Sequence, residues 1–110
     1  MLFRSKAFAH ITGGGIAANM SRVLPSAADA RLDRTSWSPP PVFGLLAARG
    51  SVPAEEMERA FNMGVGMTAV VAATDATKAL GLLAARGVPA WPLGEIVPGS
   101  GRAELHGHHR

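Results

Sequence analysis

The spacing of apolar residues changes along this chain and divides it into short helices and strands. Between a glycine triplet and Pro25, apolar residues recur every three or four positions. This spacing predicts a short helix over residues 14–24, with Thr12 near its start. Residues 31–34 are a candidate short strand, and residues 36–41 are predicted to turn because they contain three consecutive prolines.

Two further helices are expected in the middle of the chain. The first should begin in the proline cluster and run to about Arg49, where Gly50 suits the position that follows a helix. Pro53 opens the second, whose first turns carry Glu55 and Glu56. Acidic side chains at this end favour the helix dipole. An apolar face that includes Met57 should hold this helix against the core.

The second half predicts a strand, a helix and a strand. Residues 67–73 are almost continuously apolar, which is typical of a buried strand. Asp75 or its neighbour Thr74 is placed to cap a helix with an apolar stripe, which should end at Gly87. Residues 90–97 form the last predicted strand. Together these make a β-α-β unit, and the predicted fold is α/β or α+β, a small sheet with packed helices.

Composition fits one small folded domain and argues against several functions. The chain has 110 residues, of which 47% are hydrophobic and 17% charged. Its net charge of +3 would suit nucleic acid, but the basic residues are scattered, whereas a nucleic-acid footprint needs clustered charge. There is no cysteine and no apolar run of the ~20 residues that a membrane span needs. We therefore expect a cytoplasmic protein with no nucleic-acid or membrane partner.

The main candidate for chemistry is the segment His10, Thr12, Gly13, Gly14 and Gly15. Each glycine costs roughly 1 kcal/mol relative to alanine in a helical turn, so a triplet indicates a close approach of the backbone to a ligand or a sharp turn. Free N–H groups at the start of a helix attract anions. We predict a loop that binds phosphate or substrate, to which His10 could donate; a tight turn between two elements is the alternative.

A second glycine-containing loop leads into the apolar strand. Asn62 and Gly64 can take positive φ, and Gly66 permits close packing, so a ligand role and a plain helix cap with strand entry both stay open. Asn19 and Arg22 should share one helix face, with Arg22 either reaching a phosphate or solvated.

The tail contains three histidines, His106, His108 and His109. Histidines at this spacing can bind zinc or nickel. A disordered end is the stronger expectation, and we predict no metal site. No catalytic constellation is readable in the sequence, so no catalytic residue is assigned.

Four ordered blocks resemble the phosphoribosylformylglycinamidine cyclo-ligases, also called AIR synthetases. The first block is AHITGGGI at 9–16, followed by Asn19 and by RVLP at 22–25. The second is SW at 36–37 with PPVF at 40–43, and the third is EEM at 55–57 with Arg59 and FNMGVGM at 61–67. The fourth is GEIVPG at 94–99. The resemblance covers residues 9–105 and implies part of that family's C-terminal domain. Residues 1–8 are expected to be an unmatched N-terminal segment, and 106–110 a His-containing tail. The implied domain is incomplete, because its opening strands and the preceding N-terminal domain have no counterpart in this sequence.

The resemblance implies a reaction. The family uses ATP to convert formylglycinamidine ribonucleotide to aminoimidazole ribonucleotide in de novo purine biosynthesis. The resemblance implies ATP and Mg²⁺ as cofactors, held mainly by the N-terminal domain. It also implies that the protein forms a homodimer and that this chain is inactive alone. By matching position, His10, Thr12 and Gly13 to Gly15 would face the substrate, beside Asn62, Gly64 and Gly66. The alternatives are a related ATP-using enzyme, of the selenophosphate synthetase or thiamine-monophosphate kinase type, and a non-catalytic binding or assembly module.

Overall fold

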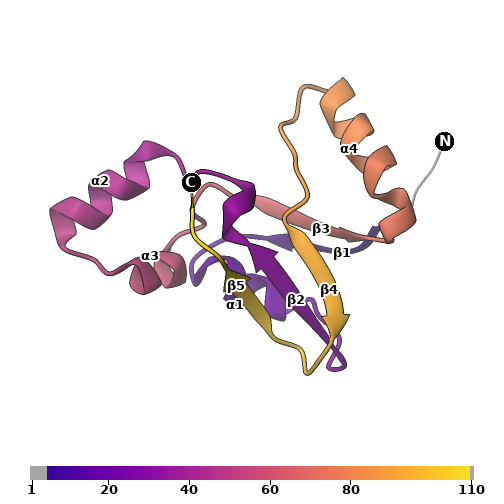
Figure 1. Cartoon of the computed structure of the whole chain (residues 1–110), viewed down its shortest axis with the longest axis horizontal. Helices are drawn as coiled ribbons and strands as arrows, with labels where there is room; N and C mark the ends of the chain where they lie inside the picture. The colour runs from indigo at the N-terminus through magenta and orange to yellow at the C-terminus, as the bar shows by residue number, and fades with distance from the viewer. Residues whose placement is uncertain (1–4, 110) are drawn as a thin grey trace.

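The computed structural model describes residues 5–109, which form two small sheets with helices around them (Figure 1). In the first sheet, β1 (Ser5–His10) pairs antiparallel with β3 (Met67–Val71). The second sheet has β2 (Ala28–Asp33) at its centre, antiparallel to β4 (Gly94–Pro98) and parallel to β5 (Ala103–His106). This arrangement confirms the predicted α+β class.

Four α-helices connect these strands within the described range: α1 (Gly15–Ser21), α2 (Pro41–Gly50), α3 (Ala54–Ala60) and α4 (Ala76–Ala85). Short 3-10 turns follow β2 at Arg34–Ser36 and precede α4 at Ala73–Asp75. The predicted end of α4 is confirmed, because Gly87 has a φ of 72° and its N–H donates to Ala84 O. The N–H of Val88 donates to Leu83 O, which completes the paired bonds that close a helix at a glycine.

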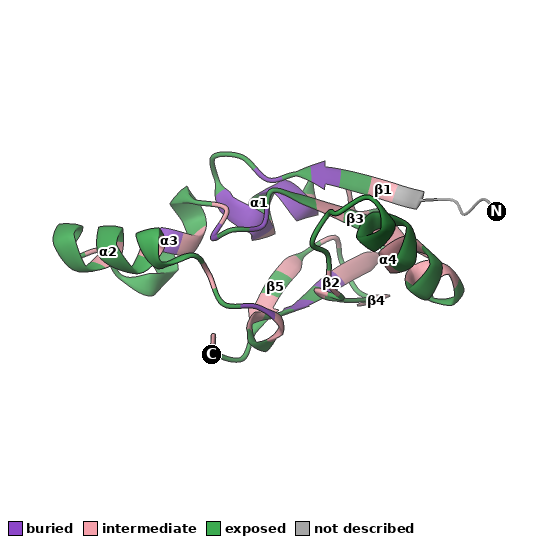
Figure 2. Ribbon diagram, turned by 90° about the horizontal axis from the view of Figure 1, so that it is seen from above, coloured by how far each residue is buried: buried purple, intermediate pink, exposed green. Residues whose placement is uncertain are grey.

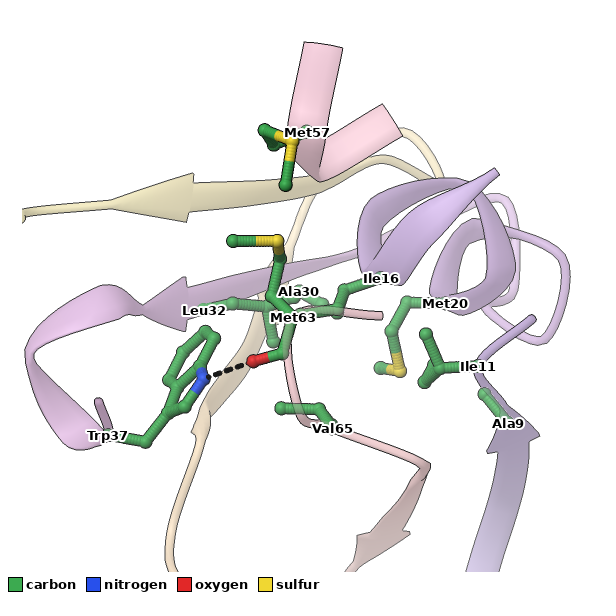
Figure 3. Close-up of a cluster of buried hydrophobic side chains, with 10 residues drawn as sticks. All are labelled: Ala9, Ile11, Ile16, Met20, Ala30, Leu32, Trp37, Met57, Met63 and Val65. Atoms are coloured by element: carbon green, nitrogen blue, oxygen red, sulfur yellow. Dashed lines mark hydrogen bonds between the residues drawn. The ribbon is translucent and has the colours of Figure 1, made fainter. Parts of the chain in front are cut away.

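The core lies between the two sheets and under α1 (Figure 3). Its buried apolar side chains come from β1, α1, β2, α3 and the loops that flank them: Ala9, Ile11, Ile16, Met20, Ala30, Leu32, Trp37, Met57, Met63 and Val65. Within β2, Ala30 and Leu32 point inward while Arg31 and Asp33 are exposed, the alternation of a strand with one covered face. By contrast, α2 and α4 contain no buried residue, and Figure 2 shows both on the outside of the molecule.

The prediction of a buried strand over 67–73 is wrong. The strand is shorter, Met67–Val71, and none of its residues is buried. Met67 is 62% exposed, and on the paired strand Phe8 is 56% exposed. A continuously apolar strand is covered on both faces when it lies in a complete sheet. In the described part of the chain, the β1–β3 pair is covered on one face only.

The predicted β-α-β unit is also wrong. β3 and β4 belong to different sheets, so α4 links two sheets instead of crossing over within one (Figure 1). The apolar stripe of α4 is only partly covered, and Leu83 remains 38% exposed. The sequence pattern identified the three elements correctly, but periodicity carries no information about which strands pair.

Several predicted boundaries shift. The first helix ends at Ser21 instead of residue 24, and β2 begins at Ala28 instead of residue 31. α2 includes Gly50, and the left-handed residue that follows it is Ser51, with a φ of 53°. The C-terminal end is not disordered as expected, because β5 pairs with β2 and the side chain of His109 is only 24% exposed.

The molecule is extended. Its radius of gyration is 14.4 Å, whereas about 13 Å is typical of a compact domain of this length. The excess fits the outward positions of α2 and α4 in Figure 2. In the described range, no helix has the length and apolar character needed to cross a membrane.

Candidate functional site

The fold brings the two glycine-containing loops together. The first loop follows β1, the second precedes β3, and these strands run antiparallel, so both loops lie at the same end of the sheet. The N–H of Ile11 donates to the carbonyl oxygen of Gly66 at 3.0 Å and joins the loops directly. Sequence reasoning nominated both loops, and the structure makes them neighbours.

Gly15 is the packed member of the glycine triplet. Its φ is 81°, and a Cβ built on it would lie 1.7 Å from the carbonyl oxygen of Glu58, at the end of α3. Its N–H donates to Thr12 O at 3.2 Å. The expectation that all three amides are free is therefore wrong at Gly15, whose amide closes the turn. Only a residue without a side chain allows α1 and α3 to approach this closely.

Asn19 holds the glycine loop from beneath. Its side chain is buried, and its Nδ2 donates to the carbonyl oxygen of Gly15 at 2.7 Å, and more weakly to those of Thr12 and Gly13 at 3.2 and 3.4 Å. Its Oδ1 accepts from the Thr12 hydroxyl and from Arg22, each at 3.3 Å. Asn19 and Arg22 are thus neighbours as predicted. The bonds of Asn19 point into the loop, however, and only Arg22 is exposed.

The outer side of the first loop consists of the remaining nominated residues, His10, Thr12, Gly13 and Gly14, all of which are exposed. Gly14 has a φ of 99°, the left-handed conformation that L side chains rarely adopt. A Cβ on Gly13 would meet nothing within 4 Å, so the space beside it is open. These residues offer backbone and one imidazole to a ligand, with no carboxylate among them.

The second loop is a tight turn built from its own polar groups. The Oδ1 of Asn62 accepts from the N–H of Gly64 at 2.8 Å, and Val65 N–H donates to Asn62 O at 3.0 Å. The positive φ expected at Asn62 belongs instead to Met63, at 53°. Gly64 has the predicted positive φ of 97°, and a Cβ there would lie 2.5 Å from Pro40 Cδ. These contacts explain the residues Asn62 and Gly64 by the turn alone, as the interpretation of a helix cap and strand entry requires.

Gly66 does not serve the close packing that we predicted. A Cβ at this position would have no neighbour within 4 Å, so nothing in the described structure requires a glycine there for space. The contact made by Gly66 is through its carbonyl oxygen, to Ile11. Its exposed position beside the first loop leaves room for a ligand.

Trp37 fixes the second loop from the side of the core. Its Nε1 donates to the carbonyl oxygen of Met63 at 3.0 Å, a buried bond shown in Figure 3. This bond satisfies the backbone at the one residue of the loop whose conformation is unfavourable for a side chain. The Trp37 ring also lies near those of Trp91 and His109, with centroids 6.3 and 4.7 Å away.

An ion pair that sequence reasoning missed ties α3 to the C-terminal segment. Arg34 donates from Nε and Nη2 to the two carboxylate oxygens of Glu58, each at 2.8 Å, and from Nη1 to Leu105 O at 2.8 Å. The hydrogen bond to Glu58 raises the pKa of Arg34. The partners are 24 and 71 positions apart, and no sequence spacing signals a pair of that kind.

A shallow groove of about 410 Å³ lies elsewhere, at the end of the three-stranded sheet. Its lining includes the charged residues Arg31, Asp33 and Glu95, and also His106. It shares no residue with the two glycine-containing loops. Among residues 5–109 there is no cluster of histidine and carboxylate side chains that could hold a metal ion.

Comparison with known proteins gives these loops a context. A family model described as "AIR synthase related protein, C-terminal domain" matches residues 2–106, and so includes both loops. Phosphoribosylformylglycinamidine cyclo-ligases of Coxiella burnetii and of Anaeromyxobacter sp. (strain Fw109-5) are 52% identical over 90 residues and 48% identical over 98 residues. These alignments cover 82% and 89% of this chain. A Streptomyces fradiae protein provisionally named as the same enzyme is 57% identical over 90 residues, 82% of this chain.

This chain spans only part of the length of these relatives. The alignments cover 50% of the Streptomyces protein, 28% of the Anaeromyxobacter protein and 26% of the Coxiella protein.

Proposed function

The chain belongs to the AIR synthase related protein family, as its C-terminal domain, and on this premise we propose that it supplies one wall of the active site of a phosphoribosylformylglycinamidine cyclo-ligase. The reaction would be the ATP-dependent closure of the imidazole ring during purine biosynthesis. On this proposal the wall consists of His10, Thr12, Gly13 and Gly14, with Asn62, Gly64 and Gly66 beside it. Gly15 would support the wall from within, because its amide is used in the turn.

One observation carries this proposal: two loops about 50 positions apart in sequence lie side by side in a region matched by the family. They are joined by the bond from Ile11 N–H to Gly66 O, and residues of both loops are exposed there. The exposed backbone of Gly13 and Gly14 would face the phosphate of the ribonucleotide, because amides without a nearby side chain suit an anion. Holding that phosphate would position the reacting atoms, and such positioning is a major source of rate in ring closure.

The groups that handle ATP are proposed to lie outside this chain. We propose that ATP and Mg²⁺ bind mainly to an N-terminal domain, as the family resemblance implies. The chain would therefore be inactive alone and would act in the cytoplasm within a larger enzyme, as a homodimer or together with such an N-terminal domain. A module that binds without catalysis is the second candidate, since the exposed side of the first loop offers backbone and one imidazole to a ligand.

Phosphate binding and turnover test the two parts of the proposal separately. With inorganic phosphate or formylglycinamidine ribonucleotide, backbone amide NMR signals of Gly13 and Gly14 should shift at millimolar ligand, and Gly14→Val should lose the response. Gly81→Ala is the matched control, since it lies in α4, outside both loops, and a Cβ there meets nothing within 4 Å. The isolated chain should hydrolyse no ATP. Unchanged amide signals would remove the binding wall, and ATP turnover by the chain alone would overturn its inactivity.

A further inference from the structure

His109 makes a contact that requires a proton on one particular ring nitrogen. Its Nδ1 lies 3.0 Å from the carbonyl oxygen of Arg34. A carbonyl oxygen only accepts hydrogen bonds, so Nδ1 must carry a proton in this contact. In the neutral ring, Nε2 then has a lone pair and no proton.

The other ring nitrogen faces a carboxylate. Nε2 of His109 is buried with no hydrogen-bond partner among the described residues, and it lies 3.8 Å from Oε2 of Glu58. Both oxygens of Glu58 already accept from Arg34, so the cost falls on Nε2 of His109, whose buried lone pair faces a carboxylate oxygen with no proton between them. Protonation of Nε2 would turn this unfavourable contact into a charge-assisted one.

The surroundings of His109 decide how strong that contact can be. The 3-10 turn contributes the Arg34 guanidinium, which already binds both oxygens of Glu58. Asp33 lies nearby, with Oδ1 3.6 Å from the position of a Cβ on Gly107. α1, which packs on β5, carries no charged residue, and His106 and His108 are exposed. Because Glu58 would be shared between two cations, the contact should be favourable but modest.

We propose that His109 is a proton-controlled latch for the C-terminal segment, residues 103–109. When Nε2 is protonated, it donates to Glu58 and fastens this segment to α3 and Trp37. When the ring is neutral, the segment is held less tightly. Residues 107–110 lie beyond the range matched by the family, so the latch is a property of this chain and does not depend on the proposed function.

The latch also reaches the candidate site. The His109 ring stands edge-on to Trp37 at 4.7 Å, and Trp37 donates to Met63 O in the second loop. A segment held tightly against Trp37 should restrict the motion of that ring and of the loop it fixes. Proton concentration would therefore alter the rigidity of the second loop through two contacts.

Hydrogen exchange of the whole chain at pH 6 and pH 8, across the range where imidazole ordinarily titrates, tests the latch. After correction for intrinsic exchange, amides of residues 103–107 should be roughly two- to fivefold better protected at pH 6. His109→Gln should abolish this difference. The matched control His108→Gln alters an exposed histidine of the same segment and should keep it. No difference in the wild type, or a difference that persists in His109→Gln, would overturn the proposal.

A second measurement does not depend on any variant. The ¹⁵N shifts of the His109 ring report which nitrogen is protonated. The neutral ring should be the Nδ1–H tautomer because Arg34 O accepts from that atom. A neutral ring found as the Nε2–H tautomer would show that the contact with Glu58 already has its donor, and the latch would have no basis.

Discussion

At the scale of single residues, the glycine triplet divides into positions with different physical roles. Gly13 has open space around it, Gly14 has a left-handed backbone, and Gly15 combines a left-handed backbone with direct contact to α3. The three glycines therefore differ in what a side chain at each position would meet. Only the first two leave the backbone available to a ligand.

The triplet allows a matched pair of substitutions. Gly15→Ala should destabilise the chain by about 3 kcal/mol or more, because its Cβ would overlap the carbonyl oxygen of Glu58 and the backbone conformation disfavours a side chain. Gly13→Ala should change the free energy of unfolding by no more than about 0.5 kcal/mol. Urea denaturation followed by circular dichroism would measure both. If the two variants lost equal free energy of unfolding, the close packing of Gly15 against α3 would not be the reason that this position needs glycine.

The residue scale also shows where sequence reasoning succeeds. It identified Gly64 as a residue that can take left-handed backbone, because a glycine in a turn between predicted elements is a local signal, and Gly64 has a φ of 97°. It placed the positive φ of the second loop at Asn62 when Met63 has it. Asn62 instead accepts the Gly64 N–H, and the buried Trp37 bond holds Met63 in place. That bond joins residues 26 positions apart, so a local pattern could not predict it.

At the scale of elements, β2 is held in register by a carboxylate at its start. Asp29 Oδ1 accepts from the N–H groups of Ser100 and Arg102, each at 2.8 Å, and so fixes the turn between β4 and β5. These bonds, first from Arg102 and then from Ser100, lower the pKa of Asp29. One side chain thus sets the position of both neighbours of β2.

Acid should loosen this turn. Since the pKa of Asp29 is lowered in the folded state, its stabilisation is present above the ordinary aspartate value of about 3.9 and is lost as the pH falls through the folded value. Exchange protection of the Ser100 and Arg102 amides should therefore decrease below about pH 4. Asp29→Asn should show weaker protection at pH 7 and little further change on acidification. An unaltered pH profile in that variant would assign the acid sensitivity to another carboxylate.

Elements and their pairing differ in how far sequence can predict them. The helices after Pro40 and after Pro53, the start of a strand at Met67 and the glycine end of α4 follow from local signals, and the structure confirms them. β2 was predicted too short because Ala28 and Asp29 have poor strand propensity, and its pairing with β4 and β5 compensates for this. Which strands pair depends on contacts distant in sequence, so the two sheets and the Arg34–Glu58 pair could not be predicted.

At the scale of the whole molecule, much apolar surface is left outside the core. Phe8 and Met67 lie on the uncovered face of the β1–β3 pair, and α2 exposes Val42 and Leu45, each about half accessible. Together with the extended shape, these surfaces have the character of faces that pack against other protein. The β1–β3 pair is also a two-stranded sheet in the described range, an arrangement that is marginal in water without further support.

The isolated chain is therefore expected to self-associate. In sedimentation velocity runs from about 5 to 200 µM, its mean sedimentation coefficient should rise with concentration, since unpaired strand edges and apolar faces favour association. Phe8→Lys with Met67→Lys should reduce that rise at little cost in stability, because these side chains are 56% and 62% exposed. Val42→Lys, a single change at an exposed position on α2, tests whether any added charge has the same effect. If the wild type stays monomeric across this range, or if Val42→Lys is as effective as the double change, the face formed by β1 and β3 is not the surface through which copies associate.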